Sequence, residues 1–124
     1  MNDIAEALIG KTITAYDIEE SGDYIRFTMK DGSTVTLITY SEYSTHTWIE
    51  SLDAPDALLG RVQDVEDINM PDLGDIDGTR YKCVDRVTYY GLKITTNKGR
   101  CVIDYRNDSN GYYGGRLEVV KGAE

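Results

Sequence analysis

The most regular pattern in the chain is an alternation of apolar and polar residues in two neighbouring segments, 24–30 and 34–38. A period of two residues is that of a β-strand with one buried face. The dipeptide Asp31-Gly32 separates the two segments. Asp-Gly between alternating runs predicts a β-hairpin closed by a type I′ turn. The side chains expected in its buried face include Ile25, Phe27, Val35 and Leu37.

Shorter patterns of the same kind follow along the chain. Further strands are expected at residues 11–18, 48–49, 62–68 (a strand or an irregular edge), 80–95, 101–105 and 117–120. Short helices are expected at residues 1–9 and 53–60, the second outlined by an Asp cap, an early Pro and a closing Gly. Helices this few and short do not supply the crossovers of a parallel sheet. We therefore expect one mainly β domain over residues 1–124: a curved antiparallel sheet, partial barrel or sandwich with one or two short helices.

Glycine and acidic residues mark the connections between these segments. Gly91 is expected to bend or bulge the long segment that contains it. Asn97-Lys98-Gly99 is expected to form a second tight turn. Residues 69–79 read as an acidic loop.

Composition points to a soluble, intracellular protein. No apolar run approaches the roughly 20 residues that a membrane-spanning helix needs, and the first residues lack the basic and apolar regions of a secretory signal. We expect no membrane association and a cytoplasmic location. Cys83 and Cys101 each fall in an expected strand, which favours buried free thiols in a reducing compartment. If those strands pair, the two sulfurs would be neighbours.

Charge is divided unevenly along the chain. Residues 1–79 hold 17 Asp and Glu against four Lys and Arg, whereas residues 80–124 hold nine Lys and Arg against five Asp and Glu. The net charge of −9 disfavours broad binding to duplex DNA. Six of the ten tyrosines lie in the basic part. Guanidinium groups neutralise phosphate and aromatic faces stack on bases, so this part suits a phosphate- and base-bearing small molecule.

The most promising ligand site is the segment 105–116, which is rich in Gly, Asn and Tyr and flanked by arginines. Its glycines would allow close approach of the backbone, and its Asn side chains could read a base or ribose. The ligand-binding residues expected here are Tyr105, Arg106, Asn107, Asn110, Tyr112, Tyr113 and Arg116, with Tyr43, His46 and Trp48 walling one side. The alternative is a glycine-rich connection whose tyrosines pack on the sheet.

Catalytic and metal-binding patterns are weak. His46 is the single histidine, and no nucleophile elbow, metal-ligand spacing or phosphate-binding loop accompanies it. The acidic run 72–78 fails as a calcium loop, because Leu73 and Val84 occupy positions that need Asp and Glu. We therefore expect no enzyme activity, no catalytic residue, no cofactor and no metal.

Several short motifs resemble small uncharacterised proteins of tailed phages and their prophages. They include Gly10-Lys11-Thr12, Trp48-Ile49-Glu50, Thr96-Asn97-Lys98-Gly99 and Ser109-Asn110-Gly111-Tyr112-Tyr113. The resemblance covers most of residues 10–120 and implies a phage-derived cytoplasmic protein of the infected bacterium. By analogy with small phage proteins as a class, it suggests a counter-defence role.

Two functions follow as hypotheses. The leading one is a homo-oligomeric sponge that sequesters a nucleotide-derived immune signal, with Arg106 and Arg116 on phosphate and Tyr112 or Tyr113 on the base. The alternative is an acidic inhibitor, or nucleic-acid mimic, that occupies a basic groove on a host defence protein. An enzyme that degrades such a signal is a third, weaker option.

Overall fold

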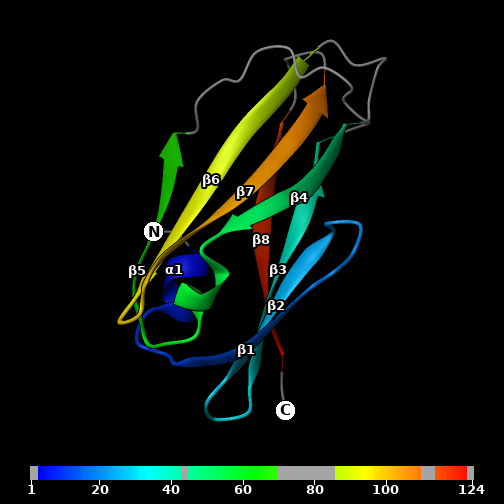
Figure 1. The fold of residues 1–124 in the computed structure, drawn as a ribbon. Coiled ribbons are helices and arrows are strands. Elements are labelled where there is room, and N and C mark those ends of the chain that lie inside the picture. Colours follow the sequence, from blue (N-terminus) through cyan, green and yellow to red (C-terminus); the bar gives the residue numbers. More distant parts are fainter. Residues whose placement is uncertain (1–2, 43–44, 70–85, 110–113, 123–124) are drawn as a thin grey trace.

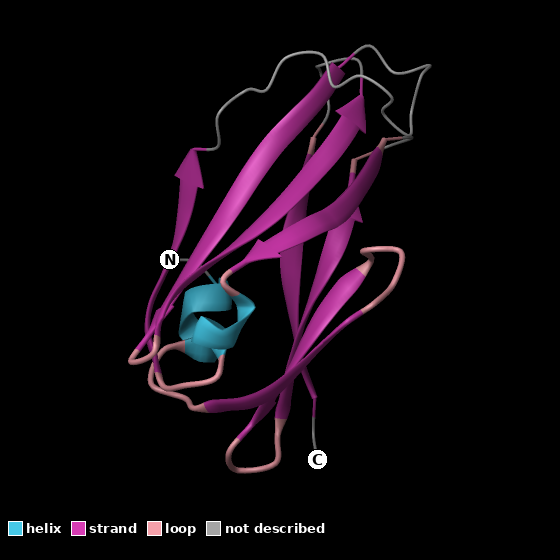
Figure 2. Cartoon of the chain, in the orientation of Figure 1, coloured by secondary structure: helices cyan, strands magenta, loops and turns pink. Residues whose placement is uncertain are grey.

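The fold consists of two four-stranded antiparallel sheets packed face to face (Figures 1 and 2). The computed structural model describes residues 3–42, 45–69, 86–109 and 114–122. One sheet has the order β1-β2-β3-β8, and the other has the order β4-β7-β6-β5. The strands are β1 Ile13–Ile18, β2 Tyr24–Met29, β3 Thr34–Ser41, β4 His46–Asp53, β5 Val62–Asn69, β6 Arg86–Thr96, β7 Gly99–Ser109 and β8 Gly115–Gly122. The prediction of a mainly β fold is confirmed. The fold is a sandwich, and its described strands do not close into a barrel.

The last strand joins the sheet that the first strands form. β8 follows β7 along the chain but pairs with β3, from Ser41 opposite Gly115 to Thr34 opposite Gly122. As a result the free edges β5 and β8 belong to different sheets. Helix α1, Asp3–Leu8, packs against both of them and fills part of the gap between the sheets (Figure 1). No helix among the described residues is long and apolar enough to cross a membrane.

The core lies between the sheets and follows the predicted alternation. All four hairpin side chains expected in the core are at most 1% exposed. They share the core with apolar residues of the other sheet, of the inward side of α1 and of a short 3-10 turn, among them Leu8, Leu58, Leu92, Ile94 and Ile103. Burying an aliphatic or phenyl side chain of this size contributes about 1.5–3 kcal/mol. This packing between the two sheets stabilises the association of strands that lie far apart in the sequence.

The β2–β3 connection is a hairpin, but its turn is not type I′. Only Gly32 in this connection has a positive φ, 90°, whereas a type I′ turn needs a positive φ at Asp31 as well. Gly32 donates its N–H to the Met29 carbonyl at 2.9 Å, and Met29 donates to the Ser33 carbonyl at 2.9 Å. This is the three-residue connection in which a type I turn ends in a left-handed glycine. Asp31 stabilises it by accepting the Ser33 N–H.

The helix predicted at residues 53–60 is one turn of 3-10 helix, Pro55–Leu58. Asp53 ends β4 and does not cap the 3-10 turn. The cap position is taken by Ala54, which has a left-handed conformation and makes no side-chain hydrogen bond. The buried side chains of Ala57 and Leu58 hold the turn against the core instead. Tertiary packing here replaces the capping that the sequence suggested.

Some of the other expectations are confirmed, one is wrong, and others fall outside the described residues. The N-terminal helix and the Asn97–Lys98 turn are confirmed. β6 pairs with β7 without a register shift across Gly91, so no bulge forms there. The expected strand at residues 80–84, Cys83 and nearly all of the acidic loop lie outside the described residues.

Replacing Gly32 tests the hairpin geometry. Gly32→Ala should lower the free energy of unfolding by about 1 kcal/mol, because an L side chain resists a φ of 90°. Lys30→Ala, in the same turn but without a positive φ, should change it by less than about 0.5 kcal/mol. Denaturant unfolding of both variants gives the comparison, and equal effects would contradict the left-handed role of Gly32.

The buried thiol of Cys101 gives a second test. Burial, with the nearby charge of Asp53, raises the pKa of this thiol from 9.0 to about 11. The stabilisation from keeping it neutral is therefore complete below pH 9 and is lost as the pH rises through about 11. In a Cys83→Ser background, the free energy of unfolding should fall more over this window with Cys101 present than in Cys101→Ala. A thiol reagent that labels native Cys101 as fast as unfolded Cys101 would contradict the burial.

Candidate functional site

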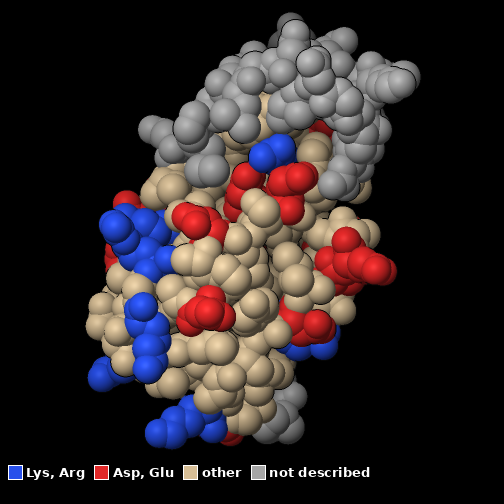
Figure 3. All heavy atoms as spheres, in the orientation of Figure 1, with Lys and Arg blue, Asp and Glu red and all other residues tan. Residues whose placement is uncertain are grey.

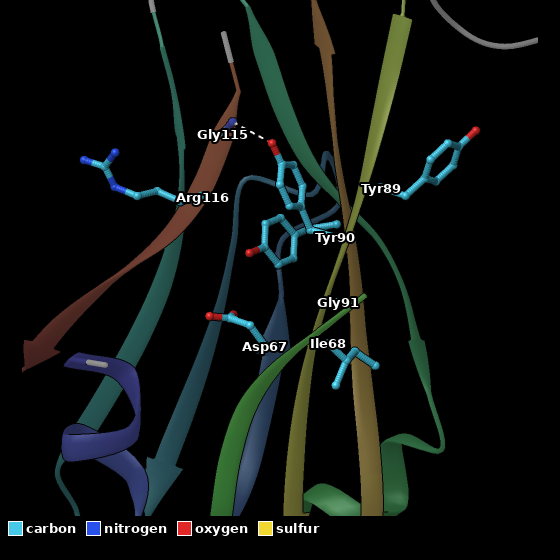
Figure 4. A pocket seen from close by; sticks show the side chains of 8 residues that line it. Asp67, Ile68, Tyr89, Tyr90, Gly91, Gly115 and Arg116 are labelled. Atoms are coloured by element: carbon cyan, nitrogen blue, oxygen red, sulfur yellow. Dashed lines mark hydrogen bonds between the residues drawn. The ribbon is translucent and has the colours of Figure 1, made fainter. Parts of the chain in front are cut away.

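A cavity of about 490 Å³ opens between the two sheets on the side of the edge strands β5 and β8. We call it the inter-sheet slot. Its lining comes from β5, β6 and β7 of one sheet and from β8 of the other (Figure 4). The lining residues are Asp67, Ile68, Tyr89, Tyr90, Gly91, Tyr105, Gly115 and Arg116. The slot is thus bounded by two strand edges that no described strand covers.

Two tyrosines form the inner wall of the slot. Tyr90 and Tyr105 are opposite each other on β6 and β7, with ring centroids 5.0 Å apart and planes 15° apart. The Tyr90 hydroxyl accepts the Gly115 N–H at 3.3 Å, which connects the two sheets (Figure 4). The Tyr105 hydroxyl has no hydrogen-bond partner among the described residues. Burial, together with Asp67 and Tyr90, raises the pKa of Tyr105 above its ordinary value, so it remains a neutral phenol.

Asp67 places a carboxylate in the slot. It lies opposite Leu92, whose side chain is in the core, and therefore on the inner face of β5. In Figure 4 its side chain extends toward the side on which β8 lies. It makes no ion pair with a described Lys or Arg, whereas its neighbour Glu66 on the outer face pairs with Lys93 at 3.4 Å. The slot consequently holds a carboxylate without a counter-ion from the described chain.

The polar interior continues beyond the slot to Asn107. This residue is fully buried, two positions from Tyr105 on the same face of β7. Its amide donates to the hydroxyls of Thr45 at 3.0 Å and Thr47 at 2.9 Å. Its carbonyl oxygen has no partner within the described part of the chain. A buried acceptor without a donor is costly, by about 1–3 kcal/mol.

Two glycines of the expected ligand loop serve close packing. A Cβ at Gly114 would lie 2.6 Å from the Tyr90 hydroxyl, and one at Gly115 would collide with the Thr47 hydroxyl. Gly114 also donates its N–H to Glu42 at 2.7 Å. The glycines therefore allow the start of β8 to approach the other sheet, which agrees with the structural alternative for this part of the segment.

Three expected site residues meet on the outer face of the second sheet, away from the slot. Arg106 is hydrogen-bonded twice to Asp104, at 2.9 and 3.2 Å, and lies 4.9 Å from the Tyr89 ring. The hydrogen bonds to Asp104 raise the pKa of Arg106. Trp48 is opposite Arg106 in the register and stacks on His46 at 5.5 Å. This cluster is already well paired within the protein.

Arg116 lies on the outer face of the other sheet. Its guanidinium is 4.1 Å from the Tyr40 ring and 2.7 Å from Glu118, and more than half of its side chain is exposed. In Figure 4, Arg116 and Tyr89 point to opposite sides of Tyr90. Because Arg106 is next to Tyr89, the two arginines are on opposite outer faces of the sandwich. They do not form the joint phosphate clamp expected from the sequence.

Of the expected set, the slot has Tyr105 in its inner wall and Arg116 at its border, with the Arg116 side chain directed outward and with Asn107 further along the strand face of Tyr105. Arg106, His46 and Trp48 are elsewhere. The remaining expected residues, Tyr43, Asn110, Tyr112 and Tyr113, lie outside the described residues. No group of three or more His, Cys, Asp and Glu side chains in the described chain is placed to hold a metal.

The place of Asp67 in the slot was not predicted from the sequence, because β5 is irregular. The register shifts between Val62 and Asp64, so the inner face carries Val62, Val65 and then Asp67. Without the shift, the two-residue alternation counted from Val62 would have placed Ile68, and not Asp67, on the inner face. The signal was the three-residue spacing of the two valines, which a regular strand cannot place on one face.

Comparison with known proteins gives a family but no function. The family described as a domain of unknown function, DUF7448, matches residues 6–119. No curated protein and no solved structure matches the chain. The slot must therefore be interpreted from its own chemistry.

The contact between Gly115 and Thr47 can be tested with a double-mutant cycle. Gly115→Ala should lower the free energy of unfolding by about 1–3 kcal/mol, the usual cost of overpacking. Thr47→Ala removes the hydroxyl that a Cβ at position 115 would meet, but it also removes three hydrogen bonds, to Ser41, Tyr40 and Asn107. The double variant should lose less than the two single losses together. Simple additivity would show that the two positions do not constrain each other.

Proposed function

Because the chain belongs to the DUF7448 family, a domain of unknown function, the family brings no activity with it, and we propose that the protein sequesters a nucleotide-derived small molecule. The base would enter the inter-sheet slot. Binding without chemical conversion would be the whole function. The observation that carries the proposal is the presence of Tyr90, Tyr105, Asp67 and Arg116 around one cavity.

The size and walls of the slot support a base. Its volume of about 490 Å³ falls within the roughly 300–1,000 Å³ typical of small-molecule sites. Tyr105 is buried and stacked on Tyr90, so the half-buried ring of Tyr90 is the one that a base would reach, and an aromatic face stabilises a stacked base by about 1–3 kcal/mol. Asp67 adds hydrogen-bond acceptors beside these rings.

Arg116 supports the phosphate end of the ligand. It borders the slot, and its guanidinium is directed to the outer face of β8, where its exposed side chain would meet a phosphate that extends out of the slot past this edge. Its present partner is Glu118, an exposed carboxylate two residues away on the same strand. An exposed ion pair of this kind is worth only about 0–1 kcal/mol, so a phosphate can replace Glu118 at little cost. Arg106, held by Asp104, has no part in this proposal.

The same residues favour binding over catalysis. A hydrolytic site needs a general base and a general acid within reach of the substrate. The described lining of the slot has one carboxylate and three tyrosines, and Tyr105, whose pKa is raised, stays protonated and so does not serve as a base. His46 stacks on Trp48 away from the slot.

The acidic-inhibitor alternative is supported by the net charge of −9 and by exposed Asp64, Glu66 and Asp67 on the edge strand β5. On the face drawn in Figure 3, however, the Asp and Glu side chains form separate groups, and Lys and Arg side chains lie beside them, most of them along the left side of the view. A basic groove on a partner would meet both signs of charge there. The slot is the more specific feature, and we place the inhibitor second.

The proposal can be tested with two matched arginine variants. Titration calorimetry with a panel of nucleotides should find a binder, and Arg116→Gln should weaken its binding by about 1.5–3 kcal/mol, the scale of a charged hydrogen bond. Arg106→Gln, on the opposite face, should leave the affinity unchanged. Melting temperatures of all three proteins control for folding. Absence of binding across the panel, or equal loss in both variants, would contradict the proposal.

A further inference from the structure

We propose that Asp67 makes the inter-sheet slot selective for guanine bases. This inference rests on the proposed function and names the class of nucleotide that the slot would take. It depends on one feature: an accessible carboxylate, without a cation partner in the described chain, next to the aromatic wall of the cavity.

The position of Asp67 favours recognition of a ligand over a structural role. A buried or paired carboxylate would already have its hydrogen-bonding capacity used, as Asp104 has with Arg106. Asp67 has no hydrogen bond or ion pair among the described residues, and it is exposed at the open side of the slot. Its charge also acts on Tyr105, so the carboxylate and the aromatic wall are close together. The competing role is that of a charged residue that protects a free strand edge from pairing.

The chemistry of the bases then determines the selectivity. An ionised carboxylate has two oxygen acceptors and no donor. Guanine presents two parallel donors, the ring N1–H and the 2-amino group, which match both oxygens. Adenine and cytosine present an amino donor next to a ring nitrogen lone pair, which would face the second oxygen unfavourably. Uracil and thymine present one donor between two carbonyl oxygens.

The tyrosines are compatible with the same base. Tyr105 remains a neutral phenol and can donate a hydrogen bond to a carbonyl acceptor such as guanine O6. The Tyr90 hydroxyl already accepts from Gly115 and retains its proton for donation. The described slot therefore combines acceptors at β5 with donors on its inner wall. A site built to hydrogen-bond a donor discriminates strongly against analogues that lack it, because its own polar groups are left unpaired.

The experiment measures the binding of GMP, IMP and AMP to the full-length protein by titration calorimetry. IMP differs from GMP only in lacking the 2-amino group. Wild type should bind GMP at least about tenfold more tightly than IMP or AMP, a difference of one charged hydrogen bond. Asp67→Asn should abolish this preference. Glu66→Gln, which removes the neighbouring carboxylate from the outer face, should preserve it.

The outcomes separate this inference from the proposed function. Equal binding of GMP and AMP by wild type would overturn guanine selectivity while leaving nucleotide sequestration intact. A preference for GMP that survives Asp67→Asn would overturn the role of Asp67. If none of the three nucleotides binds, the proposed function and the inference both fail. A melting temperature of Asp67→Asn at or above that of wild type would show that any loss of binding does not come from unfolding.

Discussion

The close approach of β8 to the opposite sheet is the constraint on which the rest of the structure depends. Gly114 and Gly115 bring the start of β8 to Tyr90 and Thr47, where any side chain would meet the Tyr90 or Thr47 hydroxyl. From there β8 runs along β3, in the sheet that does not contain β5. Helix α1 packs between the two edges further along β8. The slot is the part of the gap that neither the glycine contact nor the helix fills.

The interior of the sandwich changes from apolar to polar along strand β7. The inward side chains of β7 are in turn Cys101, Ile103, Tyr105 and Asn107. The first two belong to an apolar core, and the last is hydrogen-bonded to threonines of β4. Packing alone would favour apolar residues throughout, since a buried amide with an unpaired oxygen costs free energy. A polar end to the core is consistent with a place where a ligand or water completes the hydrogen bonding.

Local pattern and tertiary context determined different parts of the fold. The alternation over residues 24–38 was enough to predict the hairpin and its buried face, because a strand places every second side chain on one side. The register shift in β5 left only the three-residue spacing of Val62 and Val65 as a trace in the sequence, and the loss of the cap at Asp53 left none, since both depend on contacts with distant segments. The same holds for the site. Arg106 and Arg116 flank one segment in the sequence, yet the crossing of β8 to the other sheet sends them to opposite faces.

The position of β8 in the opposite sheet also makes the two edges of the slot differ in charge. Asp67 on β5 directs its carboxylate into the slot, whereas Arg116 on β8 borders the slot and directs its guanidinium to the outer face, so the two edges carry opposite charges. A molecule with hydrogen-bond donors at one end and negative charge at the other would be oriented by both edges at once. A molecule with phosphate at both ends would be repelled at β5, which matters in a protein of net charge −9. Under the proposed function, these charges would favour a ligand of unlike ends, bound base first, over a simple polyanion.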